Sequence, residues 1–229
     1  MITFKIISKK DYEKSNKKPN QEKVWNSIAK PWKTYVVKKI PIVEEFLKDK
    51  KGKVIDLGCG TGRNMIPNKN IEYTGIDFSS DQLKQAKKYI SKNKINAKLI
   101  KAQAHNLKNI KSKTFHQGLF IATLHCIETK ENREKALKEF QRVLKKNATA
   151  LISVWNSKDK RFNKVNNQGS IYMSWKEQGV PYMRYYYLYK KQELKNLLEK
   201  TGFKIIKTYR SRKKDRFSRK NWIFEIKKV

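Results

Sequence analysis

The chain has little cysteine, no metal-ligand spacing and no long apolar run. Cys59 and Cys126 are its only cysteines and lie in separate motifs, so we expect no structural disulfide and a reducing, cytoplasmic location. Two cysteines and three histidines leave no recognised set of metal ligands, so no metal is expected. No segment approaches the ~20 apolar residues of a membrane span. Residues 1–10 also lack the apolar region of a signal peptide, and we expect no membrane association.

Acidic residues are scarce as well. Aspartate and glutamate number 20 against 55 lysines and arginines, which gives a formal net charge of +35 and an isoelectric point near 10.1. This excess predicts a polyanionic partner, above all a nucleic acid. A bias in residue usage is the alternative, because the lysines are spread over the whole chain.

The C-terminal arginines favour the nucleic acid. Four of them lie within ten residues, and the forked guanidinium group binds phosphate in a two-pronged geometry that lysine lacks. A solvated loop is the other interpretation of this segment. We expect an RNA-binding cluster made of Arg210, Arg212, Lys213, Lys214, Arg216, Arg219 and Lys220.

Three closely spaced glycines follow a short apolar run at residues 54–57. Gly58, Gly60 and Gly62 require a sharp turn at the end of a strand, and they bring backbone without a Cβ against another group. A second apolar run, residues 71–76, ends in Asp77. A carboxylate at the end of the second strand is placed to accept both hydroxyls of a ribose. Turn and carboxylate together predict a nucleoside-binding α/β domain.

The residues around the turn narrow the ligand. The pattern D-x-G-x-G-x-G, which begins at Asp56, resembles motif I of the class I S-adenosylmethionine-dependent methyltransferases rather than the longer G-x-G-x-x-G of dinucleotide sites. The resemblance implies S-adenosylmethionine as the cofactor. It places the turn against the methionine end, Asp77 on the ribose and Gln103 by the adenine, where the family usually has an acidic residue. The implied cofactor-binding residues are Asp56, Gly58, Cys59, Gly60, Gly62, Asp77, Phe78, Gln103, Ala104 and Ala122.

The apolar periodicity predicts alternating strands and helices. Strands are expected over residues 53–57, 71–76, 97–101, 115–122, 148–155, 203–209 and 222–226, and helices over 21–30, 41–50, 80–90, 130–144 and 192–200. Alternation favours a parallel sheet with right-handed crossovers, and the last two strands favour an antiparallel pair. The predicted fold is therefore α/β, a Rossmann-like seven-stranded methyltransferase sheet that is mostly parallel, with an antiparallel C-terminal strand and helices on both faces.

Two segments, one at the N-terminus and one inside the domain, do not fit the alternation of strands and helices. Residues 1–20 are polar and lysine-rich, so we expect a basic N-terminal extension with a short strand near residues 2–7. Residues 21–229 are expected to form a single methyltransferase domain. Within it, residues 156–187 have no strong period and are predicted to be an insertion on the substrate side.

Further motifs resemble the wobble-uridine tRNA methyltransferases, which esterify the carboxylate of 5-carboxymethyluridine. The run from Arg184 to Tyr189 is the most specific, and residues 24–29, 41–47, 121–125 and 219–222 match in the right order. The resemblance implies the tRNA anticodon stem-loop as a partner, together with a small zinc-bearing activator protein. The chain departs from the family at residues 35–37, Gln103, His116, Cys126 and Tyr187.

The chemistry of such a reaction demands little. A carboxylate is ionised at neutral pH, so methyl transfer to it requires no general base. Arg184 is the candidate to orient that carboxylate, Tyr185 to stack on an unpaired base, and His125 to contact the substrate. Core packing is the alternative for Tyr185 and for His125. Two rival functions stay open: a small-molecule methyltransferase, and a tRNA-binding protein with a decayed cofactor site, which Gln103 and His116 would support.

Overall fold

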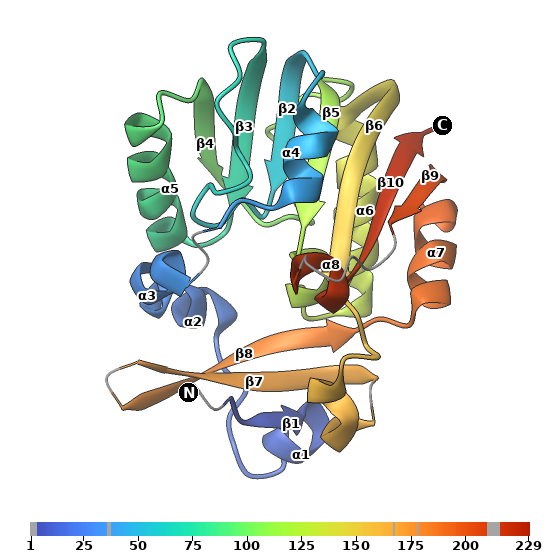
Figure 1. The fold of residues 1–229 in the computed structure, drawn as a ribbon. Helices are drawn as coiled ribbons and strands as arrows, with labels where there is room; N and C mark the ends of the chain where they lie inside the picture. Colours follow the sequence, from blue (N-terminus) through green and yellow to red (C-terminus); the bar gives the residue numbers. More distant parts are fainter. Residues whose placement is uncertain (1–3, 36–37, 167, 178, 210–215) are drawn as a thin grey trace.

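The computed structural model describes residues 4–35, 38–166, 168–177, 179–209 and 216–229, which form two sheets (Figure 1). The larger sheet has seven strands in the order β4-β3-β2-β5-β6-β10-β9. All pairs from β4 to β6 are parallel, whereas β10 is antiparallel to both of its neighbours. This arrangement confirms the predicted fold class. The strands are β2 (Gly52–Leu57), β3 (Ile71–Asp77), β4 (Ala97–Lys101), β5 (Phe115–Ile121), β6 (Leu144–Trp155), β9 (Phe203–Tyr209) and β10 (Asn221–Lys228).

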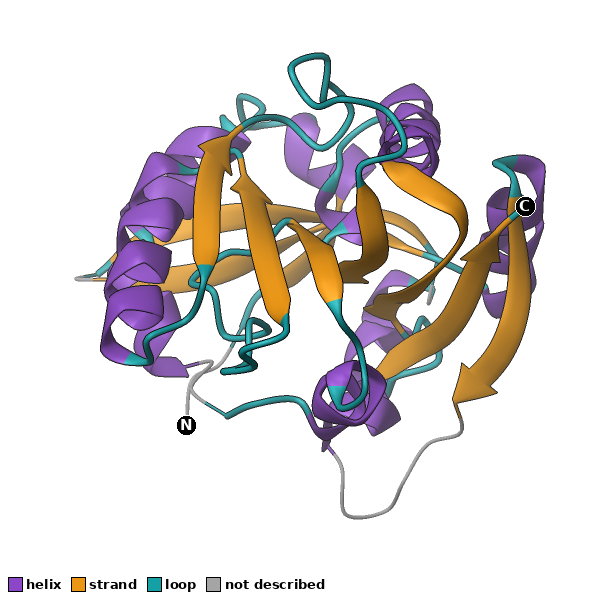
Figure 2. Ribbon diagram, turned by 90° about the horizontal axis from the view of Figure 1, so that it is seen from above, coloured by secondary structure: helices purple, strands orange, loops and turns teal. Residues whose placement is uncertain are grey.

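Helices cover both faces of this sheet (Figure 2). On one face, α4 (Pro41–Leu47) and α5 (Ser80–Lys92) pack over a core that includes Tyr73 and Leu119. On the other face, α6 (Lys130–Val143) and α7 (Lys191–Lys200) pack over Phe120 and Phe224. The central strands are therefore buried from both sides, as the nearly continuous apolar runs predict, whereas the edge strands β4 and β9 keep exposed positions.

The first predicted helix is divided in two. α2 (Gln21–Ser27) ends before Ile28, and α3 (Ala29–Tyr35) continues through Pro31. Proline is tolerated in the first turn of a helix, where its missing N–H group has no partner to lose, so Pro31 does not end the helix as expected. Among the described residues, no helix is both long enough and apolar enough to cross a membrane.

A second, three-stranded sheet lies across the carboxyl ends of the parallel strands (Figure 1). Its strands are β1 (Ile6–Ser8), β7 (Gly169–Glu177) and β8 (Val180–Leu188), all antiparallel, with α1 (Lys9–Glu13) packed against β7. The expected N-terminal extension and the expected insertion therefore meet in one sheet. A short helical segment, η2 (Lys160–Val165), precedes it.

Candidate active site

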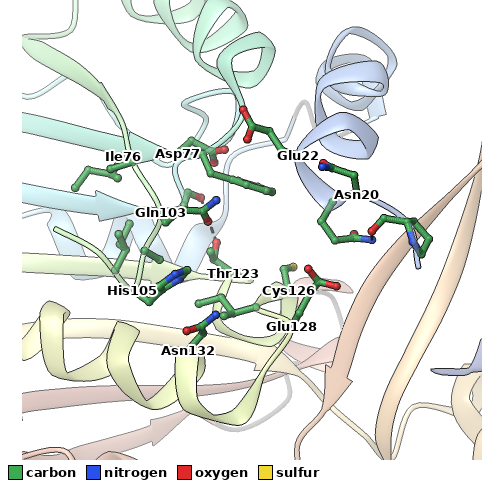
Figure 3. Close-up of a pocket in the computed structure, with 18 of the residues that line it drawn as sticks. Asn20, Glu22, Ile76, Asp77, Gln103, His105, Thr123, Cys126, Glu128 and Asn132 are labelled. Atoms are coloured by element: carbon green, nitrogen blue, oxygen red, sulfur yellow. Dashed lines mark hydrogen bonds between the residues drawn. The ribbon is translucent and has the colours of Figure 1, made fainter. Parts of the chain in front are cut away.

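Three adjoining cavities lie between the large sheet and the small one. The first has a volume of about 530 Å³ and is bordered by the ends of β2, β3 and β4 (Figure 3). The second, of about 690 Å³, is bordered by β8, the end of β6 and α3. A connecting cavity of about 100 Å³ lies along the glycine turn. Cys126 lines all three cavities, so it marks the point where they meet.

The glycine turn has the backbone that its sequence requires. Gly58 has a φ of +74°, and a Cβ there would overlap the side chain of Thr123. Gly60 has a φ of +52°, and its N–H group donates to Asp77 Oδ2 at 2.9 Å. Both backbone conformations are costly for other residues. The turn therefore stays close to the end of β5 while its backbone borders the connecting cavity.

Two buried carboxylates lie beneath this turn. Asp77 Oδ1 accepts from the backbone N–H of Ser79 at 2.9 Å, and burial raises the pKa of Asp77 to about 6. Asp56 is completely buried, and neither of its carboxylate oxygens accepts a hydrogen bond of good geometry from a described residue. Burial, followed by the charge of Asp77, raises its pKa to about 7. A hydroxyl-bearing ligand in the first cavity could bond to Asp77, and a cationic one would favour the ionised form of both carboxylates, although Asp56 lines none of the cavities.

Phe78, Gln103 and Ala104, which the resemblance assigns to the cofactor, also line the first cavity. His116, which the sequence marked as a departure, lies at the opposite end of β5. Its Nδ1 accepts from the backbone N–H of Lys53 at 3.0 Å. The departure at His116 therefore does not touch this site.

The segment at residues 18–22, which we call the roof, closes the first cavity on the side of the small sheet. Asn20 and Glu22 face Asp77 and Gln103 across the cavity in Figure 3. Two partly exposed ion pairs attach the roof, Lys18 to Glu128 at 3.2 Å and Lys101 to Glu22 at 2.7 Å. Part of the expected extension thus belongs to the site.

The second cavity is lined by aromatic and cationic side chains and, among its described lining residues, by no carboxylate. Its centre is Arg184, which is only 2% exposed. The Arg184 guanidinium lies 5.2–5.6 Å from the ring centres of Phe4, Trp32, Trp175 and Tyr186. Its Nη2 donates to the Ser174 carbonyl at 3.2 Å, while its Nε has no partner among the described residues. The remaining charged lining residues are Lys38, Lys39, Arg63, Arg161 and Lys220.

His125 lines the same cavity between two aromatic rings. Its ring centre lies 5.0 Å from that of Trp155 and 5.6 Å from that of Tyr186. Burial, helped by the charge of Arg161, lowers the pKa of His125 to about 3, so its imidazole is neutral at pH 7. Neither ring nitrogen, nor the Tyr186 hydroxyl, has a hydrogen-bond partner among the described residues. These groups are available to a polar ligand.

Comparison with known proteins identifies the family. A model described as a methyltransferase domain matches residues 48–202. The chain belongs to this methyltransferase domain family.

The relatives and solved structures agree with this assignment. The methyltransferase is 27% identical over 208 residues to the tRNA (carboxymethyluridine(34)-5-O)-methyltransferase of Schizosaccharomyces pombe, across 80% of this chain and 88% of that protein. It is 33% identical over 135 residues to the protein of the same name from Saccharomyces cerevisiae, across 58% and 47%. An S-adenosylmethionine-dependent methyltransferase structure from Methanosarcina mazei matches with a TM-score of 0.66 at 20% identity, across 84% and 99%. The predicted resemblance to the wobble-uridine enzymes is thus confirmed, and the structural match concerns the fold.

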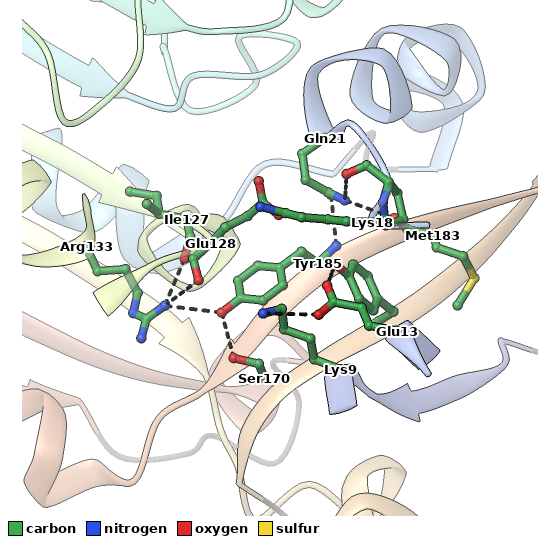
Figure 4. A network of polar contacts seen from close by, with 12 residues as sticks. Lys9, Glu13, Lys18, Gln21, Ile127, Glu128, Arg133, Ser170, Met183 and Tyr185 are labelled. Carbon is green, nitrogen blue, oxygen red and sulfur yellow. Dashed lines mark hydrogen bonds and ion pairs between the residues drawn. The ribbon is translucent and has the colours of Figure 1, made fainter. Parts of the chain in front are cut away.

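The methyltransferase places Arg184 and His125 together but sets Tyr185 apart. Successive residues of a strand point to opposite faces, so Tyr185 faces away from the second cavity. Its hydroxyl group lies 2.8 Å from Ser170 Oγ and accepts from Arg133 Nη1 at 3.2 Å (Figure 4). Tyr186 instead lines the second cavity, in the place that was expected for Tyr185. The alternation of side chains along the strand, counted from Arg184, was the signal that could have identified Tyr186.

The ends of β5 and β6 and the segments after them contribute Ala122, one of the expected cofactor-binding residues, together with Trp155 and Arg161, which the sequence did not single out. Ala122 has a φ of +53°, which is unusual for a residue with a Cβ, and its N–H donates to Ser153 Oγ at 3.0 Å. It separates the connecting cavity from the second one. Trp155 and Arg161 also line the second cavity, with the Arg161 guanidinium 5.0 Å from the centre of the Trp155 ring. The positive φ of Ala122 is a backbone strain of a kind that is common at functional sites.

The predicted RNA-binding cluster is described only in part. Arg210, Arg212, Lys213 and Lys214 lie outside the described residues. The helix α8 (Arg216–Lys220) contains the rest of the cluster, with Arg219 exposed and Lys220 lining the second cavity. The described end of the cluster therefore borders the cavity that holds Arg184.

Proposed function

We propose that this methyltransferase uses S-adenosylmethionine to convert the carboxylate of 5-carboxymethyluridine, at the wobble position of a tRNA, into its methyl ester. Relatives that carry the name of this reaction support the proposal. The observation that carries it is a set of buried polar atoms that have no hydrogen-bond partner among the described residues: Arg184 Nε, both ring nitrogens of His125 and the Tyr186 hydroxyl. They border an aromatic cavity with no carboxylate among its described lining residues. These groups suit a planar, polar and anionic ligand.

The first cavity and the turn fit the cofactor. Asp77 would accept the ribose hydroxyls, and Phe78 and Gln103 would border the adenine. Asp56 is buried at the end of β2, two residues before the glycine turn, and lines none of the three cavities, so its ionised form would attract the cationic methionine end without contact. A glutamine carbonyl can accept the hydrogen bond of the adenine amino group without a charge. When bound, S-adenosylmethionine supplies an electrophilic methyl group.

The second cavity fits the modified base. A carboxylic acid with a pKa of about 4 is ionised at neutral pH, so the enzyme must position its oxygen rather than remove a proton. Arg184 would hold the carboxylate through paired N–H groups. A neutral His125 offers one donor and one acceptor nitrogen, which suits the N–H and carbonyl edge of uracil. The surrounding rings would stack on the base for about 1–3 kcal/mol each.

The RNA outside the cavity would contact the basic cluster. Arg219 and Lys220 lie next to the opening, and the cluster as a whole would bind the phosphates of the anticodon stem-loop. A small zinc-bearing activator protein and a cytoplasmic location remain predictions that rest on the resemblance and on the composition.

Nucleoside mass spectrometry tests this function. The purified protein is incubated with S-adenosylmethionine and with unlabelled tRNA from a strain that lacks this protein. We expect it to convert 5-carboxymethyluridine into its methyl ester. Calorimetry with S-adenosylhomocysteine separates the alternatives, because a tRNA-binding protein with a decayed cofactor site would give no heat. Cofactor binding without any change in the wobble nucleoside, with or without cell extract as a source of activator, would instead favour a small-molecule substrate.

A further inference from the structure

The side chain of Gln21 joins the roof of the first cavity to the strand that carries Arg184. It is 6% exposed, and its Oε1 accepts from the backbone N–H of Tyr185 at 2.9 Å (Figure 4). Its Nε2 donates to the Met183 carbonyl at 3.2 Å and to the Pro19 carbonyl at 3.3 Å. One buried amide thus bonds to the residues before and after Arg184.

The position of β8 explains why this amide matters. β8 is at the edge of the order β1-β7-β8, so one row of its backbone groups has no neighbouring strand among the described residues. The Gln21 amide pairs with that row as the peptide of another strand would. Strand backbone that is held on both sides of Arg184 fixes the direction in which the Arg184 side chain enters the second cavity.

The same residue lines the first cavity. The other attachments of the roof, Lys18 with Glu128 and Lys101 with Glu22, join side chains that are 25–54% exposed. Exposed ion pairs of this kind contribute little. The buried Gln21 amide is therefore the main link between the roof and β8.

We propose that Gln21 is a positioning residue that couples the two cavities: a ligand in the first cavity holds the roof closed, and through Gln21 this fixes the β8 backbone around Arg184. The coupling is reciprocal, so a ligand on Arg184 also favours the closed roof. The proposal rests on the proposed function only for the identity of the two ligands.

Hydrogen exchange of the Tyr185 amide tests the link without any activity measurement. In the free protein, Gln21→Ala is expected to speed this exchange about tenfold, because the amide loses its buried acceptor. S-adenosylhomocysteine is expected to slow it in the wild-type protein but not in the variant. Gln192→Ala is the matched control, since Gln192 pairs with Asn196 on the exposed face of α7. An exchange rate that is unchanged by Gln21→Ala, or by the ligand in the wild type, overturns the proposal.

Two further measurements keep the test decisive. If Gln21→Ala does not fold, Gln21→Glu replaces it, because the carboxylate keeps the acceptor for Tyr185 and loses only the donor to the Met183 and Pro19 carbonyls. On tRNA, Gln21→Ala is expected to lower kcat/KM about tenfold in the wild-type background and less than twofold in an Arg184→Ala background. Equal losses in both backgrounds contradict the proposal. Absence of product from the wild type as well would reject the proposed function alone, since the exchange result still decides the link.

Discussion

The first and second cavities are built in different ways. The first is formed mainly by the ends of neighbouring parallel strands, with Asp77 and the glycine turn close together in the sequence. The second gathers Phe4, Trp32, Trp155 and Arg184 from four distant segments. The first is lined by the buried carboxylate of Asp77, whereas the second has cations and no carboxylate among its described lining residues.

This difference separates the two tasks of the enzyme. An open α/β sheet offers a nucleoside site wherever its strands end, so the first cavity is a property of the fold. The second cavity exists only because the small sheet and α3 add aromatic and cationic residues above those strand ends. Specificity for a substrate therefore belongs to the added elements. Apart from changes at Gln21, which joins the two cavities, a change in either cavity is expected to affect one ligand and leave the other nearly unaffected.

The largest expected effect is on cofactor binding. Asp77→Ala removes the carboxylate that would accept two ribose hydroxyls, and we expect the affinity for S-adenosylhomocysteine to fall by about 100-fold or more. RNA affinity should stay within twofold. Calorimetry and filter binding measure the two ligands separately. Asp77→Asn preserves the shape of the site, and Asp49→Ala, in an exposed loop, is the control. Equal losses of affinity for both ligands would contradict the assignment of the cofactor to the first cavity and of the RNA to the second.

The second-largest expected effect is on methyl transfer to the tRNA substrate. Arg184→Lys keeps a positive charge but loses the forked geometry, and we expect kcat/KM on tRNA to fall about 30- to 100-fold. The affinity for S-adenosylhomocysteine should change less than threefold, because Arg184 lines only the second cavity. Arg142→Lys, on α6, is the matched control, since Arg142 bonds to Glu139 and lies outside both cavities. A loss of cofactor affinity as large as the loss in kcat/KM would contradict the assignment.

The large sheet could be predicted from the sequence because its signals are local. A few neighbouring residues are enough to predict each of its parts: the apolar runs of β2 and β3, the glycine turn and Asp77 at the end of β3. The small sheet has no such signal. β1 is only three residues long and pairs with β7, Ile6 opposite Met173, so nothing near either strand marks the contact.

The tyrosine run shows the same limit at the level of one side chain. Tyr185, Tyr186 and Tyr187 are identical in chemistry, so the sequence assigns Tyr186 to the face of Arg184 only once this stretch is known to be a strand, and a register shift of one residue would exchange the faces. Burial of both faces removes the usual contrast between apolar and polar positions. The role of Gln21 was equally out of reach, because it depends on an edge strand that is distant in the sequence.

The pH dependence of cofactor binding is the third effect. Asp77 has a pKa of about 6 and Asp56 of about 7, both raised by burial, and both are expected to serve the ligand in their ionised form. Affinity for S-adenosylhomocysteine should therefore be greatest above pH 8, fall up to about tenfold per pH unit between pH 7 and pH 6, and fall more steeply below pH 6, where both groups take up protons. In the free protein the sign is opposite: carboxyl groups with raised pKa values add stability as the pH falls from about 7 toward 4. Calorimetry from pH 5 to 8 checks this, and Asp77→Asn should flatten the profile.

The smallest expected effect concerns the basic cluster. It tests whether the bound RNA extends from the second cavity along α8. Reversing the charge of Arg219 should weaken tRNA binding several-fold at moderate salt. It should also reduce the slope of log affinity against log salt by about one, because one phosphate contact is lost. Lys204→Glu is the matched control, since it makes the same charge change on an exposed position of β9. If both variants reduce the slope equally, the net charge of the chain attracts the RNA and α8 is not a specific contact. A reduced slope for Arg219→Glu alone, with unchanged affinity for S-adenosylhomocysteine, places the RNA on the side of the second cavity.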